Sequence, residues 1–172
     1  MSERDWADEC TTYAAAKLAG CARQVVRCAR LLGDTALWYR SNDHTNSVGN
    51  LVLHLTGNVR QWIVAGLGGK TFDRDRPAEF AARGPAPVEE VVASFERVVQ
   101  DALEVLETLN AEQLLTRRRI QGYDVSGLVA MLHAMEHFSG HTGQIVHITK
   151  LLKDIDLSLY DDQGQRLAGE GP

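Results

Sequence analysis

The segment from about Ser126 to Lys153 constrains the fold more than any other part of the sequence. Read as an α-helix, it carries apolar side chains in almost every direction, so other elements must surround it. Its polar residues fall largely on one narrow stripe, formed by His133, His137, His141 and Gln144. Side chains four residues apart drift by only about 40° around a helix. The sequence therefore predicts a central helix with a row of histidines on one face.

Apolar residues recur at helical spacing elsewhere in the chain, and no alternating run is long enough to propose a sheet. Segments rich in Gly, Pro and charge separate the expected helices, which cover about 9–32, 47–67, 87–109 and 126–153. We expect 70–86 to be a long irregular loop, suited to cover a cleft. With 172 residues, 44% of them hydrophobic, the chain predicts one all-α domain, a four-helix bundle over 1–153, followed by a polar tail over 154–172.

Charge and hydropathy exclude several classes of partner. The net charge of −5 disfavours nucleic acid, and the one basic run, Arg117 to Arg119, is interpreted as a solvated connection. No stretch approaches the ~18–20 apolar residues of a membrane span, and the start, MSERDWADEC, is acidic where a signal peptide is basic. We therefore expect a cytoplasmic protein. Its cysteines, Cys10, Cys21 and Cys28, match no metal or redox spacing and are expected to be small hydrophobic side chains.

The histidine row contains a spacing that metal sites use. Two imidazoles at positions i and i+4 reach one ion from the same helix face, as His137 and His141 would. His133 cannot easily share an ion with His141, because eight residues span about 12 Å along the axis. A third ligand must come from another helix, and the second expected helix offers His54 within a polar stripe walled by apolar residues. The alternatives are histidines satisfied within a core and a stripe that faces solvent.

Polar neighbours of these histidines are candidates for hydrogen bonds that orient the rings. Asn58 and Gln61 follow His54 by one and two turns, and Gln144 follows His141 by three residues. Ligand histidines commonly donate their second ring N–H to such partners. We therefore expect Asn58 or Gln61 to support His54, and Gln144 to support the pair on the last helix.

The loop after the second helix carries charged residues that have two possible interpretations. Arg74, Arg76 and Glu79 are expected to line the cleft entrance, where the arginines would bind an anionic substrate or a thiol cofactor. Surface ion pairs are the alternative interpretation. No catalytic acid or base is assigned, since Glu136, the nearest carboxylate in sequence, lies about 100° around the helix from His137.

Three motifs together resemble the DinB-like (damage-inducible, YfiT-like) superfamily of proposed metal-dependent enzymes. They are NSVGNLVLHLTGNVRQW at residues 46–62, RDRPAEF at 74–80 and HFSGHTGQI at 137–145. The likeness extends over nearly the whole chain from the second helix onward. It is greatest for a bacterial subfamily whose activity is unassigned.

The resemblance implies an up-down-down-up four-helix bundle, commonly a homodimer, with one divalent metal held by His54, His137 and His141. Zinc or nickel suits such imidazole ligation. The superfamily includes transferases and isomerases that use the thiols bacillithiol or mycothiol, so a low-molecular-weight thiol is a candidate cofactor. The resemblance assigns no role to the remaining histidines, His44, His133 and His147.

Two classes of function remain open at this point. Three imidazoles leave a coordination position for water or a thiol, which favours a small-molecule hydrolase or thiol-dependent transferase. The alternative is a non-catalytic bundle that binds a metal or a ligand without turnover. A cavity beside the histidines would favour the enzyme, and a fourth protein ligand, such as His133 or Asn58, would favour the binding module.

Overall fold

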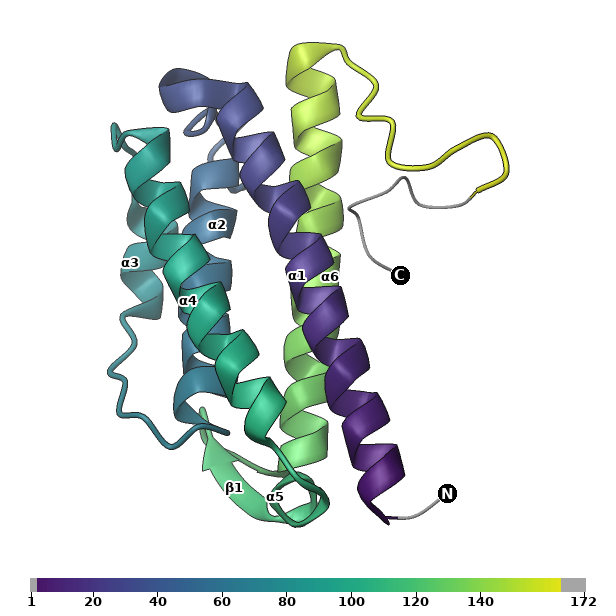
Figure 1. Cartoon of the computed structure of the whole chain (residues 1–172). Helices are drawn as coiled ribbons and strands as arrows, with labels where there is room; N and C mark the ends of the chain where they lie inside the picture. The colour runs from purple at the N-terminus through teal and green to yellow at the C-terminus, as the bar shows by residue number, and fades with distance from the viewer. Residues whose placement is uncertain (1–2, 165–172) are drawn as a thin grey trace.

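The computed structural model describes residues 3–164, and four long helices form its body (Figure 1). In that view α1 and α6 run upward, and α2 and α4 run downward. The all-α expectation is confirmed, apart from one two-stranded hairpin. The elements along the chain are α1 (Glu3–Ala36), α2 (Val48–Val59), the π-helix η1 (Arg60–Ala65), α3 (Arg76–Ala81), α4 (Val88–Thr108), α5 (Ala111–Leu115), β1 (Arg117–Ile120), β2 (Tyr123–Ser126) and α6 (Gly127–Lys153).

The first helix is longer at both ends than its apolar periodicity predicts. The backbone leaves helical geometry at Gly33 (φ 69°, ψ 179°), where the sequence predicts the end, but one further turn reaches Ala36. Glycine adopts this positive φ without a Cβ clash. The turn is retained because Leu37 and Trp38 pack beyond it, and Leu37 is fully buried.

The second helix begins where its N-cap predicts. The Ser47 hydroxyl accepts a hydrogen bond from the Asn50 backbone N–H, and the Asn50 side chain accepts one from Ser47 N–H, forming a reciprocal capping box. The helix continues into η1, where N–H groups bond to carbonyls five residues back, as Gly66 does to Gln61. Such π-turns recur at functional sites, and this one follows His54 by two turns.

The expectation of an irregular loop over 70–86 is wrong in its centre. Residues Arg76–Ala81 form α3, capped by the Asp75 side chain, which accepts a hydrogen bond from Ala78 N–H. A helix this short is not stable by its own residue propensities. It packs against α2, and this tertiary contact is not visible in the sequence pattern. At the end of this segment Pro87 is the N-cap of α4, so the helix begins at Val88, one residue later than the predicted start at 87.

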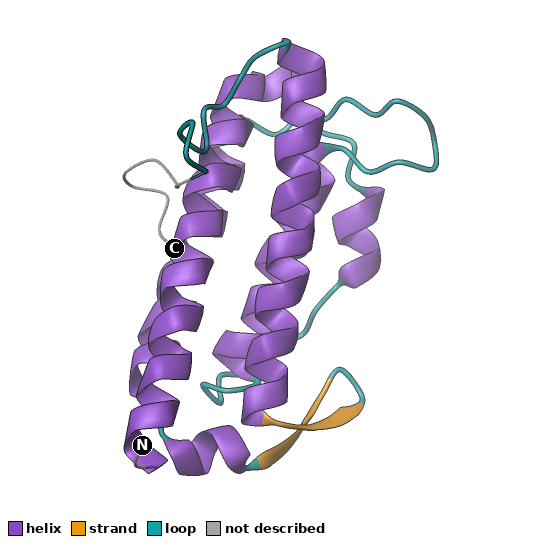
Figure 2. Cartoon of the chain, turned by 90° about the vertical axis from the view of Figure 1, so that its right-hand side faces the viewer, coloured by secondary structure: helices purple, strands orange, loops and turns teal. Residues whose placement is uncertain are grey.

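The absence of strands is also a wrong expectation. Strands β1 and β2 pair antiparallel, with Ile120 opposite Tyr123, at the end of the bundle where α6 begins (Figure 2). The run Arg117–Arg119 lies in β1 and is only partly the solvated connection expected. Arg118 points inward and donates hydrogen bonds to the carbonyls of Gly66, Leu67 and Gln113. Ser126 caps α6, so this helix begins close to the predicted start at 126.

The core lies between the four long helices, and α1 packs most extensively against α6 and α4. Phe95 of α4 and Phe138 of α6 stack at its centre, with ring centroids 5.9 Å apart and each side chain 1% exposed. Cys21 and Cys28 are buried free thiols, as expected, and Cys10 is half-buried. No helix among residues 3–164 combines the length and the apolar character needed to cross a bilayer. The predicted tail lies partly outside the described residues, which end at 164.

The Phe95–Phe138 pair generates a stability prediction. Phe138→Ala leaves a cavity in the centre of the bundle and should lower the free energy of unfolding by about 3–5 kcal/mol. Urea unfolding followed by circular dichroism measures this. The matched control is Leu132→Ala on the same helix, which is 54% exposed and should change stability by about 0.5 kcal/mol or less. Equal losses for the two variants would contradict the assigned core.

Candidate metal centre

Three histidines from two helices converge near the middle of the bundle. His54 comes from α2, and His137 and His141 come from consecutive turns of α6. One ring nitrogen from each lies within 4.8 Å of the others, and His54 Nε2 is 2.8 Å from His137 Nε2. This is the set predicted from spacing and from the family resemblance. Among residues 3–164, His133 is not part of this group.

Hydrogen bonds from outside the cluster determine which ring nitrogens are free. His54 Nδ1 lies 2.9 Å from Glu79 Oε2, and a carboxylate can only accept, so Nδ1 carries the proton. His141 Nδ1 likewise donates to Gln144 Oε1 at 2.8 Å, as predicted for Gln144. In the neutral form of each of these two rings, the lone pair is therefore on Nε2. Neutral imidazoles with Nδ1–H held by oxygen acceptors are the usual form of histidine ligands.

Burial favours the neutral forms of His137 and His141. Burial, followed by the neighbouring rings His141, His54 and His133 and the charge of Arg74, lowers the pKa of His137 to about 3. Burial also lowers the pKa of His141, and the charge of His54 adds to this, although the hydrogen bond to Gln144 opposes it. Lone pairs are thus available at neutral pH, which is what coordination of a divalent ion requires.

The partner of His54 is Glu79 of α3, and not Asn58 or Gln61 as expected. Glu79 is held by Arg74, whose Nε and Nη2 donate to its two oxygens at 2.7 and 2.8 Å. The Arg74 and Glu79 side chains are only 4% and 11% exposed, so they are not surface ion pairs. Gln61 instead accepts a hydrogen bond from Arg74 Nη1 at 2.9 Å. Gln61 is therefore connected to the His54 ring through Arg74 and Glu79, whereas the sequence predicts a direct contact with His54.

The same pair of charges defines the state of Glu79. Burial raises the pKa of the Glu79 carboxyl, but hydrogen bonds from His54 and Arg74 and the charges of both outweigh it, so the pKa lies below its usual value. The 3.1 Å contact between Arg74 Nη2 and His54 Nδ1 is not a hydrogen bond, because both nitrogens carry protons directed at the same carboxylate. The sequence analysis predicts that Arg74 binds an anionic ligand. In the structure its guanidinium is instead bonded to Glu79 and Gln61 within the site.

Local sequence in α2 places α3 against His54. The buried Asn50 amide donates to the carbonyls of Glu79 at 3.0 Å and Ala82 at 2.9 Å, in addition to its capping role. One turn beyond His54, Gly57 leaves room for the Glu79 carboxylate, which a Cβ at this position would strike. The motif at 46–62 thus contains the residues that cap α2, the candidate metal ligand His54, and the residues that contact α3.

The other histidines and the remaining charged candidates lie apart from the cluster. His133 is exposed and contacts Trp62, with ring centroids 4.2 Å apart and the ring planes tilted by 45°. His44 and His147 are exposed in a loop and on α6. Arg76 is exposed at the N-terminus of α3, with its guanidinium 4.9 Å above the Phe80 ring.

A cavity of about 400 Å³ opens beside the cluster. His54 and His137 form part of its wall, Trp62 and His133 another part, and β2 of the hairpin closes one side. Its volume is within the range of small-molecule sites, about 300–1,000 Å³. The candidate ligands are therefore reachable from solvent on one side and packed by protein on the other.

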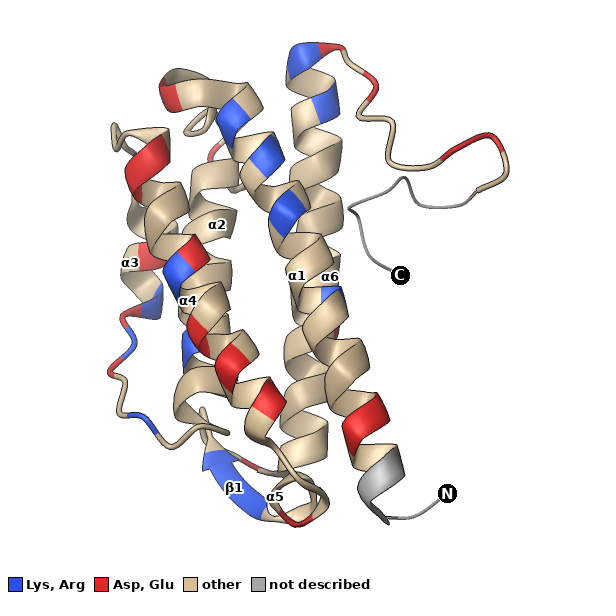
Figure 3. Cartoon of the chain, viewed as in Figure 1, with Lys and Arg blue, Asp and Glu red and all other residues tan. Residues whose placement is uncertain are grey.

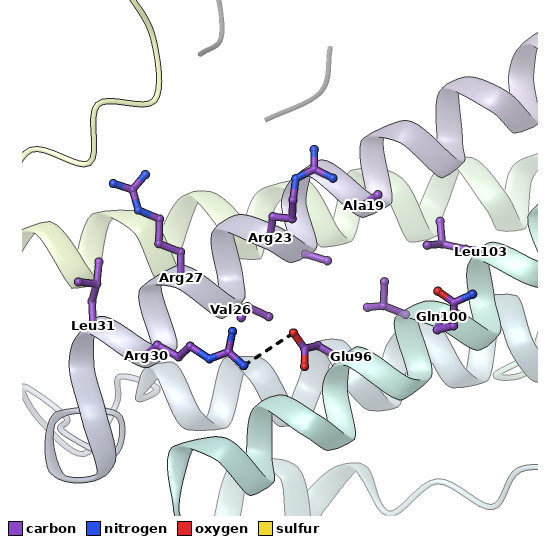
Figure 4. Close-up of a pocket in the computed structure, with 11 residues that line it drawn as sticks. Ala19, Arg23, Val26, Arg27, Arg30, Leu31, Glu96, Gln100 and Leu103 are labelled. Carbon is purple, nitrogen blue, oxygen red and sulfur yellow. Dashed lines mark ion pairs between the residues drawn. The ribbon is translucent and has the colours of Figure 1, made fainter. Parts of the chain in front are cut away.

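A larger cavity, of about 800 Å³, lies in the groove between α1 and α4 (Figure 4). It contains no histidine, and its walls are alkyl side chains with arginines along α1. Arg30 faces Glu96 across it at 4.0 Å. Figure 3 shows the same division, with basic residues along α1 and acidic residues along α4. The chemistry of the donor groups, and not cavity size, selects the histidine cavity as the functional site.

Comparison with known proteins places the chain in a family. The sequence matches the family described as "Protein of unknown function (DUF1572)" over residues 6–160. The chain belongs to this family. No curated protein matches the DUF1572 chain significantly.

Two solved structures are similar to the DUF1572 chain. A DinB-like protein from Bacillus subtilis shares 17% identity, with 90% of this chain and 99% of that chain covered and a TM-score of 0.66. A DinB-like protein from Bacillus cereus ATCC 10987 shares 16% identity, with 82% and 87% covered and a TM-score of 0.62. At these identities the likeness shows the fold alone. The predicted DinB-like resemblance is thereby confirmed.

The Glu79–His54 contact generates a test of the outer part of the site. Glu79→Gln keeps a hydrogen-bond acceptor but removes the negative charge that makes His54 a better ligand. Affinity for a divalent ion should fall by about 10–100-fold, measured by titration calorimetry with zinc. The control is Glu90→Gln on the exposed first turn of α4, which should bind like the parent. Parent-like affinity in Glu79→Gln would contradict a supporting role for this carboxylate.

Proposed function

We propose that this DUF1572 protein is a metal-dependent enzyme that acts on small molecules, by thiol-dependent transfer or by hydrolysis. The observation that carries the proposal is the convergence of three imidazoles, His54, His137 and His141, beside an accessible cavity whose wall includes His54 and His137. Their donor set fits a borderline ion such as zinc or nickel. An ion bound by them would act as a Lewis acid that lowers the pKa of a coordinated water or thiol.

Each residue around the cavity has a separate task in this proposal. Glu79 and Gln144 hold the His54 and His141 rings by their Nδ1–H groups, so that the opposite nitrogens face the ion. Trp62, buried on η1, excludes water from one side of the cavity. Arg76, on the cavity wall and without an acidic partner among the described ion pairs, attracts an anionic substrate or thiol. No residue is assigned as the general acid or base.

The accessible cavity favours an enzyme over a binding module. Among residues 3–164 the histidine cluster has no fourth histidine, cysteine or carboxylate within ligand range. His133, which could have closed the site, instead packs at a tilt against Trp62. A three-ligand set leaves a position for a reacting group, whereas structural zinc sites use four protein ligands.

Metal content tests the first half of the proposal. Protein purified without a histidine tag and incubated with zinc or nickel should retain a stoichiometric ion after dialysis. His137→Ala should lose it, since two imidazoles bind far more weakly than three. His147→Ala, on the exposed surface of the same helix, is the matched control and should keep the ion. Parent protein without a stoichiometric ion would refute the proposed metal site.

Turnover tests the second half. Metal-loaded protein is incubated with bacillithiol, mycothiol or glutathione and chlorodinitrobenzene, and release of the thioether is followed by absorbance. We expect at least one thiol to react faster with the parent than with His54→Ala, because the thiol must be deprotonated at the histidine site. If metal is bound but no thiol reacts above the His54→Ala background, the transferase proposal fails and hydrolysis is the remaining enzyme class.

A further inference from the structure

The cavity beside the histidines has a second wall that the metal site does not use. Hairpin β1–β2 contributes Gln121, Tyr123 and Val125 to it, and Trp62 of η1 lies between the hairpin and α6. Tyr123 is 62% exposed, and it is the tyrosine that lines this cavity. An aromatic residue exposed at the wall of a cavity is positioned to contact a ligand.

Trp62 links this wall to the histidines. Its indole lies 4.2 Å from the His133 ring and 6.3 Å from the Tyr123 ring, centroid to centroid. His133 in turn stacks on His137 at 5.8 Å. The indole Nε1 donates to Gln121 Oε1 at 3.1 Å, which fixes the ring orientation. A continuous aromatic surface therefore runs from the hairpin to a candidate metal ligand.

The turn of the hairpin holds Gln121 in place by an unfavourable backbone conformation. Ile120 pairs with Tyr123, so the loop has two residues, and both have positive φ (52° at Gln121 and 86° at Gly122). This geometry favours Asn or Gly at the first position, and glutamine adopts it only at a cost. The cost is offset by placing the Gln121 amide on Trp62 and in the cavity, where its Nε2 donors are left for another partner.

The deeper part of the cavity has an unsatisfied polar group. Asn58 is 3% exposed, lines the cavity, and its Oδ1 has no hydrogen-bond partner among the described residues. Buried side-chain oxygens without a partner are uncommon, since they lose their hydrogen bonds to water. A ligand with an N–H or O–H group would restore this bond. Asn58 lies one turn beyond His54, so such a ligand would also lie beside the metal-ligand candidates.

The charge of the cavity selects the ligand class. Arg74 and Arg76 line it, and none of its described lining residues is acidic. The charge of Arg74 is compensated by Glu79, whereas Arg76 has no carboxylate within ion-pair distance among the described residues. An uncompensated guanidinium above a ring, here Phe80 at 4.9 Å, is oriented to bind a carboxylate. The same charge disfavours a cationic organic ligand, which cannot gain the imidazole ligation that a metal ion would gain.

We propose that the hairpin, Trp62 and Arg76 form the subsite that selects the substrate: a small carboxylate with a flat apolar group. The flat group packs against the adjoining Trp62 and Tyr123 rings, the carboxylate is bound by Arg76, and a donor on the ligand meets Asn58 Oδ1. This proposal rests on the proposed function, because it places the reacting end of the molecule at the histidines. It adds the class of substrate and the residues that distinguish it.

Binding of phenylacetate to the metal-free and the zinc-loaded protein tests the subsite without an activity assay. The readout is the Trp62 indole N–H signal in proton–nitrogen NMR, identified by its disappearance in Trp62→Phe. Phenylacetate should shift this signal saturably and bind about tenfold more tightly than neutral phenylacetamide, because its charge outweighs the hydrogen bond that only the amide can donate to Asn58. Phenylethylammonium and acetate, which lack the anion and the ring respectively, should bind more weakly than phenylacetate.

Single variants at exposed positions separate the two contacts. Arg76→Ala should abolish the preference for phenylacetate over phenylacetamide, and Tyr123→Ala should weaken both by about fivefold. Arg119→Ala, an exposed arginine on β1 outside the cavity, is the matched control and should bind like the parent. A preference that persists in Arg76→Ala, or the absence of a saturable shift, would overturn the proposal.

Metal content measured on the same samples separates this proposal from the preceding one. Bound zinc without phenylacetate binding would overturn the substrate subsite and leave the metal-dependent function standing. Phenylacetate binding by a protein that retains no metal would overturn the proposed function and leave the subsite.

Discussion

The approach of His54 to His137 across the α2–α6 interface determines the rest of the site. Two imidazole nitrogens 2.8 Å apart in a mostly buried position are desolvated, and they require partners that compensate for lost water. Glu79 is the partner of His54. The buried negative charge of Glu79 is in turn balanced by Arg74. The segment 74–80, far from His137 in sequence, is thereby folded onto α2. The four-helix frame brings the rings together, and α3 makes their burial tolerable.

Two sides of the bundle thus have different physical roles. Around Phe95 and Phe138 the helices make a close-packed apolar core that positions α2 and α6. On the opposite side of the histidines, the π-helix, α3 and the hairpin replace regular helix packing with polar and aromatic side chains around a cavity. Short elements whose stability comes from tertiary contacts are the parts of a fold that vary most easily in conformation. They are also where a substrate would be selected.

Helix-level sequence patterns predict the frame and the ligand candidates because those depend on local periodicity. The four-residue spacing of His137 and His141, and the polar stripe around His54, are visible without a structure. The partner of His54 is not predictable from sequence, because RDRPAEF has the composition of a loop and its helix is joined to α2 by hydrogen bonds from Asn50 to the Glu79 and Ala82 carbonyls. The hairpin was missed for the same reason. Each of its strands has only four residues. Arg118 donates hydrogen bonds to carbonyls that include those of Gly66 and Leu67, which are far away in sequence.

The central claim is that the three histidines bind one ion directly. X-ray absorption of the zinc-loaded protein measures the ion's nearest neighbours. We predict three imidazole nitrogens at about 2.0–2.1 Å, with one lost in His54→Ala. A first shell made only of oxygen, or one unchanged by His54→Ala, would contradict the account.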